Sequence, residues 1–570
     1  MTADAAISPR SGPAFQGGFS ARLRAAWGDS PLYQMGLKGP TPDRIAFTAP
    51  EHRHMDASLG ALIASGRFKL GATSLVVPDA DSLDKVWDLA RPGDQAFTAL
   101  HQFDWLRHLA PLQETGREAA QRLVRGWLDR FSKWDAAVWA PDICAERLTA
   151  WAQHHALFLK DSDVVWRSRT LAAFGRQLRH LARSAHRAAE GAPRLRAAMG
   201  LTLAGLCIPH GEKAADRGLE LTRRELQLQI LPDGGHISRN PSLLFDVFLR
   251  LRAVSDLLTG AKKEPPGFLR QTLDRMAPIV SYFRHGDGRL ALFHGGTEDD
   301  GAALDDALRD EDLVGAPFGF APHTGFQRLS AGRSLLIMDV GKAPPAPYFD
   351  GAHDSATAFE FSAGRHRLIV NCGAAPALDD QWRSALRRAE AHSRSVVQPK
   401  KAPPKEWAGS VLVETRRYEE AEGFWLEVEQ VGGVLAGAPE ALRRRRVFLS
   451  ALGDDLRGED SMNAPLDAFD AANPDFIVRF HLHPSVKASL ARDKKSVLLI
   501  APSGEGWRFR SDGVNLAIEK SVYLGDGERP RPCEQIVLQG GWKFEEGRSV
   551  LGVRWALQKM GRRFGAAQGA

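Results

Sequence analysis

A first group of side chains that could bind a ligand consists of tryptophans and a neighbouring arginine. Arg147 and Trp151 are four residues apart, so a helix would place both on one face. The pair could then line a binding cleft together. Aromatic faces stack on sugar rings, although such tryptophans also build protein cores. The same stretch of chain is rich in further tryptophans, namely Trp105, Trp127, Trp134 and Trp139.

Imidazoles and thiols form a second group of candidates. Arg479, His481 and His483 alternate along an apolar run, so a strand would project all three from one face. This arrangement suits a metal or an anion, and it equally suits a polar outward face. The four cysteines are scattered and show no CxxC pair. Their spacing argues against a disulfide framework and against a cysteine-rich zinc site.

Two kinds of element must position these side chains. Between about residues 95 and 290, apolar residues recur at helical spacing in segments that are broken by Pro, Gly or Asp. Pro141 and Pro241 fall where a first helical turn should begin. After about residue 320, short β-rich runs between turns predict a large antiparallel sandwich. We therefore predict a mixed or irregular lead-in at 1–94, helices at 95–320 and β-structure at 321–570.

The composition is that of an ordinary globular protein. The chain has 570 residues, 44% of them hydrophobic and 25% charged, with a formal net charge of +6. This mild basic excess suits an acidic ligand and does not require nucleic acid. The N-terminal stretch lacks an apolar signal region, and no apolar run is long enough to cross a membrane. These features predict a cytoplasmic protein without an integral membrane segment, and they leave the periplasm open.

Four local strings, taken in order, resemble proteins of the heparinase II/III family. They are QILPDGGHISRNPSLLFDV, GAHDSATAFEFSAGRHRLIVNCG, RRAEAHSRSVV and RFHLHPSV with VLLIAPSGEGWRF. The resemblance covers about residues 100 to 560. It implies an (α/α) toroid, an incomplete helical barrel, that is followed by a large antiparallel β-sandwich. The substrate cleft of the family lies between the two, and its members cleave acidic glycans by β-elimination.

β-Elimination requires a group that neutralises the uronate carboxylate, a base for the C5 proton and an acid for the leaving oxygen. The resemblance places Asn240 in the first role, with His236 and Arg239 as neighbours. Asn240 is also well suited to be the N-cap of a helix that starts at Pro241. Tyr282 takes the family's proton-transfer position, and buried aromatic packing is the competing interpretation.

Other residues are spare candidates for these roles. Tyr348 is a second tyrosine for proton transfer, and His285 and His294 could supply the base if no tyrosine does. Arg147 and Trp151 remain candidates for contact with substrate.

The resemblance also implies a structural metal site. His353 and His392 fall on the family's two metal-binding histidines, whereas Asn371 stands where the metal-binding Asp is expected. Two neutral imidazoles could hold Zn²⁺, although they prefer a charged third ligand. Gly351 replaces the family's catalytic histidine. The metal and the proton-transfer chemistry are therefore the two points at which this sequence departs from its family.

The leading hypothesis is a polysaccharide lyase that acts on an acidic polysaccharide or oligosaccharide. A non-catalytic glycan-binding or envelope-associated protein on the same fold is the alternative, because fold does not imply function. A glycoside hydrolase is a third hypothesis. It would need two opposed carboxylates, for which Asp233, Asp287 and Glu298 are available.

Overall fold

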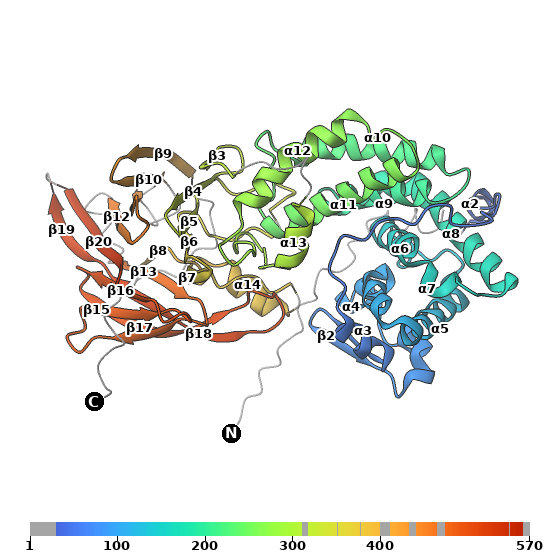
Figure 1. The fold of residues 1–570 in the computed structure, drawn as a ribbon, viewed down its shortest axis with the longest axis horizontal. Helices are drawn as coiled ribbons and strands as arrows, with labels where there is room; N and C mark the ends of the chain where they lie inside the picture. Colours follow the sequence, from blue (N-terminus) through green and yellow to red (C-terminus); the bar gives the residue numbers. More distant parts are fainter. Residues whose placement is uncertain are drawn as a thin grey trace, which may run out of the picture. The chain divides into compact units, whose positions relative to one another are not determined.

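The computed structural model describes residues 30–309, 317–349, 351–376, 378–399, 411–431, 441–463, 474–545 and 548–561. The chain forms two compact units. The first contains Met1–Glu51, Met55–Arg223 and Ala253–Glu264, and the second contains His52–His54, Arg224–Arg252 and Pro265–Ala570. Figure 1 shows the order of elements, helices first and strands later. None of the described helices is both long enough and apolar enough to span a membrane.

The first unit is mainly helical. A short hairpin of β1 (Arg67–Leu70) and β2 (Thr73–Val76) and the 3₁₀ segments η1 (Ala80–Asp88), η2 (Asp104–Leu112) and η3 (Ala185–Arg187) accompany its helices. The helices are α2 (Pro31–Gly36), α3 (Ala57–Ala64), α4 (Gln95–Gln102), α5 (Gln113–Phe131), α6 (Pro141–His154), α7 (Ala156–Leu159), α8 (Val164–Ser184) and α9 (Ala192–Leu206). The helix α10 (Glu212–Gln229) begins in this unit and ends in the second.

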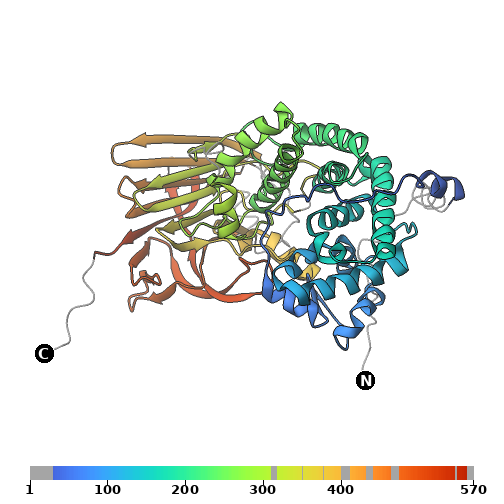
Figure 2. The same ribbon diagram turned by 45° about the vertical axis from the view of Figure 1, so that its right-hand side comes forward.

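In the first unit, helix α6 packs against α4, α8 and α9. Figure 2 shows the helices of this unit in blue to teal. Pro141 occupies the first turn of α6, as predicted, because a helix leaves its first N–H groups without partners. Of the predicted tryptophan cluster, Trp105, Trp127, Trp139 and Trp151 are all at most 5% exposed. They therefore build the core of this unit.

The second unit is dominated by two nine-stranded antiparallel sheets. One has the order β14-β15-β16-β20-β12-β11-β10-β9, with β19 also paired to β20. The other has the order β17-β18-β13-β7-β6-β5-β4-β3, with β8 also paired to β13. The strands of the first sheet are β9 (Val411–Glu420), β10 (Gly423–Val431), β11 (Leu442–Ser450), β12 (Asp455–Asn463), β14 (Lys487–Leu490), β15 (Ser496–Ile500), β16 (Gly506–Ser511), β19 (Gly541–Glu545) and β20 (Arg548–Lys559). Those of the second sheet are β3 (Phe320–Ala321), β4 (Phe326–Ala331), β5 (Ser334–Asp339), β6 (Phe359–Ala363), β7 (His366–Val370), β8 (Ser395–Pro399), β13 (Pro474–Leu482), β17 (Asn515–Tyr523) and β18 (Arg531–Gln539).

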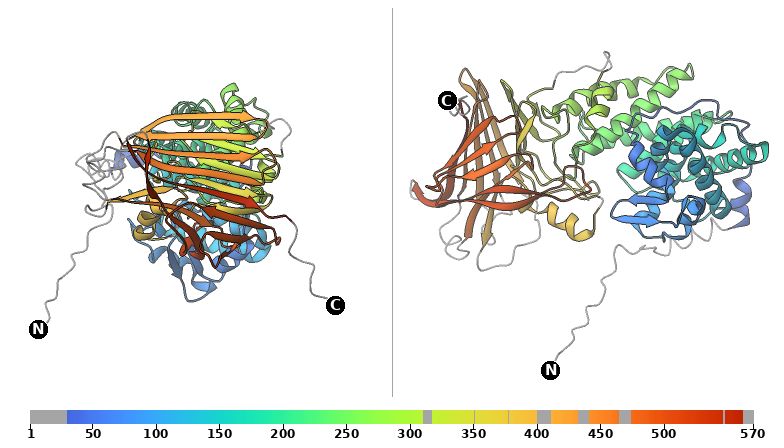
Figure 3. Two further views of the ribbon diagram at one scale, coloured as in Figure 1. Left: turned by 90° about the vertical axis from the view of Figure 1, so that its left-hand side faces the viewer. Right: turned by 60° about the horizontal axis from the view of Figure 1, so that its bottom comes forward.

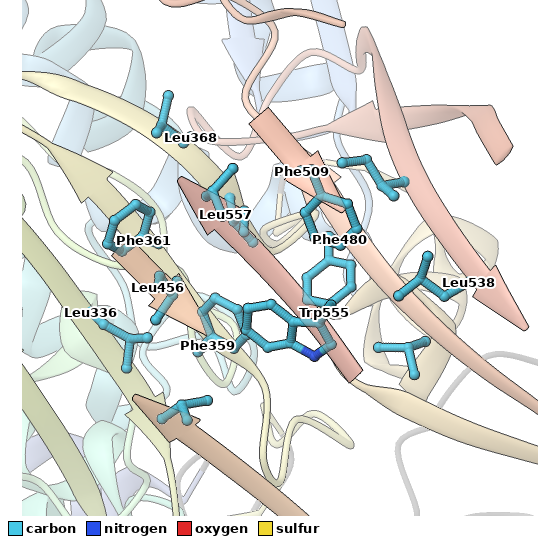
Figure 4. Packing of buried hydrophobic residues seen from close by; sticks show 14 of the residues in the cluster. Leu336, Phe359, Phe361, Leu368, Leu456, Phe480, Phe509, Leu538, Trp555 and Leu557 are labelled. Carbon is cyan, nitrogen blue, oxygen red and sulfur yellow. The ribbon is translucent and has the colours of Figure 1, made fainter. Parts of the chain in front are cut away.

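The inner faces of the two sheets share one apolar core (Figure 4). Trp555 lies at its centre and stacks on Phe359 and Phe509, with ring centroids 5.7 and 6.2 Å apart, respectively. Along β16, buried apolar residues alternate with more exposed polar ones, whereas β5 and β6 are buried along their whole length. The prediction of helices followed by a large antiparallel β-structure is confirmed.

Several helical segments belong to the second unit. They are the first half of α11 (Pro241–Gly260), all of α12 (Gly267–Tyr282), α13 (Gly301–Ala307), α14 (Asp380–Arg387) and the 3₁₀ turn η5 (Ala389–Ala391). Compact packing thus joins these helices to the strands, although the sequence places α11 and α12 in the helical run. The loops at the ends of these helices carry most of the residues that the sequence singles out for chemistry.

Candidate functional site

The DGGH turn, residues 233–236, is held to the sandwich by its own aspartate. Asp233 accepts hydrogen bonds from the backbone N–H groups of His323 and Thr324 at 2.9 and 2.7 Å, and from the Thr324 hydroxyl at 2.7 Å. Gly234 has φ of +88°, and a Cβ there would lie 1.9 Å from the carbonyl oxygen of Arg275 in α12. Only glycine fits this close approach. The turn therefore fixes the start of α11 against the strands.

Arg239 is a buried part of this frame. Its guanidinium donates to the carbonyl oxygens of Thr324, Lys342 and Gly325 at 2.7–2.8 Å and forms an ion pair with Asp339. Arg239 also adopts a left-handed backbone conformation, with φ of +62°. Each of the three side-chain nitrogen atoms of Arg239 thus donates to another atom of the protein. Its position argues against a direct role toward substrate.

Asp339, at the end of β5, is the hub of the buried polar cluster, and it is not among the residues predicted from the sequence. Besides Arg239, it binds His294 Nε2 at 3.0 Å, the Ser355 hydroxyl at 2.6 Å and the Gly341 N–H at 3.1 Å. Arg239 and His294 hold the pKa of Asp339 well below its ordinary value, against the effect of burial. The only signal for Asp339 in the sequence is that it is a single carboxylate at the end of a largely apolar run.

His294 is fixed by hydrogen bonds at both ring nitrogens. Its Nδ1 accepts the backbone N–H of His353 at 3.2 Å, so Nε2 carries the proton and donates it to Asp339. Burial and the nearby Arg239 lower the pKa of His294. A neutral imidazole with both nitrogens engaged cannot take a proton from a ligand without breaking this network.

Asn240 caps α11 and lies beside the predicted catalytic position. Its Oδ1 accepts the Leu243 N–H at 3.0 Å, which is the N-cap hydrogen bond. A Cβ on Gly295 would lie 3.4 Å from Asn240 Nδ2 and 3.1 Å from the Gly351 carbonyl oxygen. Asn240 and Gly351 therefore border the same glycine turn. A Cβ on Gly351 would meet only the His294 carbonyl oxygen, at 3.5 Å, so nothing stands against the first carbon of a side chain there.

His353 and His392 are brought together, as the resemblance implies. Their ring centroids lie 5.2 Å apart, and two imidazoles that share one tetrahedral metal would have centres about 5 Å apart. Neither ring nitrogen of the fully buried His392 has a hydrogen-bond partner in the described part of the chain. Burial lowers the pKa of His353 to about 3 and that of His392 well below its ordinary value, so both rings are neutral.

The third predicted ligand does not complete a metal centre. The Asn371 Oδ1 accepts the Ser393 N–H at 3.0 Å, and its Nδ2 donates to the carbonyl oxygen of Leu292 and to Glu360. Within the part of the chain that the structure describes, no group of three His, Cys, Asp or Glu side chains could hold a metal ion. The residues thus fit two ligands but not a three-ligand zinc site, and Zn²⁺ stays a prediction.

His285 belongs to a separate buried network under the sheet. Its Nδ1 lies 2.9 Å from the Ser362 hydroxyl and its Nε2 lies 3.0 Å from Glu360. Glu360 also accepts the Asn371 N–H at 3.0 Å. His285 is 4% exposed and its pKa is lowered, chiefly by burial. Because both ring nitrogens have partners, His285 braces β6 and does not lie open to a ligand.

The two candidate tyrosines lie in different surroundings. Tyr282 is fully buried against Phe283 and Phe318, its hydroxyl has no hydrogen-bond partner among the described residues, and burial raises its pKa well above the ordinary value. This position supports aromatic packing and argues against proton transfer. Tyr348 is half-buried in the loop before His353, beside the cis peptide bond of Ala346 and Pro347.

The remaining predicted substrate contacts are structural. His236 Nε2 binds Gln229 at 3.1 Å, and its Nδ1 accepts the Ser238 N–H at 3.1 Å, which ties the DGGH turn to the end of α10. Arg147 is fully buried in the first unit, where its guanidinium donates to Gln177 and lies 4.4 Å over the Trp127 ring. Trp151 is 1% exposed in the same core. Neither side chain reaches solvent, so their burial argues against direct contact with a sugar.

The carboxylates of the hydrolase hypothesis are also engaged. Asp287 pairs with Arg367 at 2.8 Å, and Glu298 pairs with Arg289 at 3.0 Å and accepts the Tyr523 hydroxyl. Arg367 lowers the pKa of Asp287, and the nearby His483, Arg367 and Tyr523 lower that of Glu298. A general acid needs a raised pKa, so these groups give the hydrolase hypothesis no support.

Solved structures share this fold at low sequence identity. The crystal structure of heparinase III matches with a TM-score of 0.66 and 14% identity, over 95% of this chain and 90% of that one. Heparan sulfate lyase HepC from Pedobacter heparinus matches with a TM-score of 0.55 and 15% identity, over 96% and 89%. Identity at this level establishes the architecture alone.

Sequence comparison establishes the family. Residues 314–547 match the family model of the heparinase II/III-like C-terminal domain. Along nearly its whole length, the chain is also 32% identical over 563 residues to FtsZ-localized protein C of Caulobacter vibrioides (strain NA1000 / CB15N), covering 95% of this chain and 94% of that protein. Residues 314–547 therefore form a heparinase II/III-like C-terminal domain, and the whole chain belongs to the same family as FtsZ-localized protein C.

Proposed function

We propose that this protein localises with FtsZ and acts there as a binding protein that has kept the lyase fold without lyase chemistry. The observation that carries the proposal is the end-to-end identity of 32% to FtsZ-localized protein C, which includes both the helical and the β-rich parts. Identity that spans both parts supports a shared role of the whole chain and not only a shared domain.

The site supports the absence of catalysis. Gly351 stands where the family's catalytic histidine is expected, and His294 is fixed as a neutral ring between Asp339 and the His353 backbone. Tyr282 lies in an apolar core with a raised pKa. Of the groups predicted for proton transfer, Tyr282, His285 and His294 are all buried. The buried hydrogen bonds of Arg239, Asp339 and His294 instead hold neighbouring loops of the second unit together.

Binding to FtsZ tests the proposal directly. The full chain is mixed with purified FtsZ and the affinity is measured by biolayer interferometry, with heparinase III as a control of the same fold. We expect saturable binding of this protein and none of heparinase III. Absence of binding by the full chain would contradict the proposal. In cells, a fluorescent fusion should occupy the same positions as FtsZ.

Lyase action on an acidic glycan is the second candidate function. It is favoured by Asn240, which borders the same Gly295 turn as Gly351 and whose amide nitrogen makes no hydrogen bond among the described residues. Incubation with a panel of uronate-containing glycans, followed by the ultraviolet absorbance of unsaturated products, distinguishes the two. We expect no product from the natural chain. Product from it would establish the lyase instead, and product from Gly351→His alone would show that the missing imidazole is what abolished the chemistry.

A further inference from the structure

We infer that the outer face of the first sheet, around Trp425, is the surface through which this protein holds its protein partner, and that it fits a peptide segment carrying an apolar anchor beside carboxylates. The inference rests on the proposed association with FtsZ and names the contact surface. It concerns the strands β9, β10, β11, β12, β20 and β16 of the second unit.

A row of aromatic rings crosses three neighbouring strands. Tyr418 of β9, Trp425 of β10 and Phe448 of β11 are directly opposite one another in the strand register, so their side chains lie on one face. Tyr418 is 54% exposed and Trp425 is 43% exposed. With neighbouring strands about 4.8 Å apart, the row is about 10 Å long. It is long enough to seat one or two side chains of a partner.

This face is open in the second unit. The left view of Figure 3 looks onto the orange strands of this sheet, and no helix of the second unit lies over them. The inner face of the same strands packs Leu426, Val447 and Leu456 into the sandwich core. Folding therefore does not require the outer aromatic rings to pack on another layer. Exposed tryptophan and tyrosine next to arginine is the composition of protein-binding hot spots.

A rigid charged rim borders the aromatic row. In the next register, Glu427 of β10 is paired with Arg446 and lies 3.6 Å from Arg416 and 3.7 Å from Arg444. One carboxylate thus orders three guanidinium groups. Charged groups fixed in this way exclude water from an apolar contact and lose little further freedom on binding.

The row ends in unfilled positive charge. Across the strands, Phe448 is opposite Arg457, Arg457 is opposite Ala556, and Ala556 is opposite Arg510. Arg457 is paired with Asp455, whereas Arg510 has no ion-pair partner among the described residues. With neighbouring strands about 4.8 Å apart, Arg510 lies about 14 Å from Phe448, so a carboxylate about four residues along an extended segment from the apolar anchor would reach it. Charge complementarity therefore favours an acidic segment.

The ring geometry favours a peptide over a sugar chain. The Trp425 and Phe448 rings are 4.7 Å apart but tilted by 43°. Sugar rings stack best on a flat platform, which a tilt of this size does not provide. Two tilted rings form a notch, and an aliphatic or aromatic side chain can wedge into it. We therefore assign the surface to a peptide segment.

The test measures binding of purified FtsZ to the full chain and to two variants. Trp425→Ala removes the centre of the row, and Arg510→Glu reverses the charge at its end. The matched controls lie away from the aromatic row. They are Val514→Ala, at a residue that is 74% exposed and directly precedes β17, and Lys520→Glu, at an exposed position of β17 in the second sheet. Circular dichroism melting confirms that each variant is folded. We expect at least tenfold weaker binding for both row variants and unchanged binding for both controls.

The possible outcomes separate the two proposals. If the natural chain binds FtsZ and both row variants bind equally well, the surface is wrong and the proposed function stands. If the natural chain does not bind, both proposals fail. Loss of binding by Arg510→Glu with normal binding by Lys520→Glu supports the surface even if Trp425→Ala is unstable. A uronate glycan whose binding is abolished by Trp425→Ala would overturn the assignment to a peptide.

Discussion

Asp299 shows most clearly how burial changes the chemistry of a single residue in this protein. It follows Glu298, shortly after the Gly295 turn. Its Oδ2 is buried without a hydrogen-bond partner among the described residues. Burial, with a contribution from Asp246, raises the pKa of Asp299 to about 6. Burial of this carboxylate is therefore costly whenever it is ionised.

Replacement of this carboxyl should remove a pH-dependent loss of stability. A carboxyl whose pKa is higher in the folded than in the unfolded state destabilises the fold as pH rises through the folded pKa. The free energy of unfolding of Asp299→Asn, relative to the natural chain, should therefore increase by about 1–2 kcal/mol between pH 5 and pH 8. Urea titrations at the two pH values measure it. Asp306→Asn, at an exposed carboxylate of α13, should show a constant difference, and the same behaviour in Asp299→Asn would disprove the assignment.

At the scale of elements, the DGGH turn before α11 links a helix to the sheets. Gly234 needs both a positive φ and the absence of a Cβ, because Arg275 of α12 lies against it. The Asp233 hydrogen bonds to residues 323 and 324 and the Asn240 cap then fix where α11 begins. One turn of chain thus positions the helix start beside Gly295 and Gly351.

Gly234→Ala should therefore destabilise the protein by at least about 2 kcal/mol, through backbone strain and displacement of α12. Gly260→Ala is the matched control, since nothing lies within 4 Å of a Cβ at that position and φ there is not positive. It should leave stability unchanged or raise it slightly. The midpoints of urea unfolding compare the two, and equal midpoints would contradict the packing described for the turn.

At the scale of the whole molecule, buried imidazoles are spread through both units. Burial lowers the pKa of His101 and His353 to about 3 and that of His180 and His481 to about 4. A histidine whose pKa is lower in the folded state is neutral there but becomes charged in the unfolded chain below about pH 6.5. Stability is therefore lost as pH falls below that value.

Each of these histidines should cost about 2 kcal/mol of stability between pH 7 and pH 5. The urea midpoint of the natural chain should fall steeply over this range. His353→Gln should lose less than the natural chain, because it lacks one protonation on unfolding. A midpoint that does not change between pH 7 and pH 5 would show that these rings are not kept neutral in the folded state, and an equal loss in the variant would show this for His353.

The sequence by itself determined the architecture of this protein. Periodicities of 3.6 and 2 residues follow from how helices and strands bury one face, so the spacing of apolar residues alone separates the helical part from the sandwich. Local preferences of the same kind predict the helix starts at Pro141 and Pro241, and both helices begin there. The resemblance to the heparinase II/III family is visible in ordered strings that span both parts.

Only the tertiary structure decided which candidate residues are free to act. Burial and hydrogen-bond partners come from segments far apart in the chain, so no local pattern reveals that Tyr282 faces phenylalanines or that Arg239 is paired with Asp339. The same holds for the outer aromatic row, since Tyr418, Trp425 and Phe448 share a face only through strand register. Side-chain types are written in the sequence, whereas their ionisation and accessibility depend on what the fold places around them.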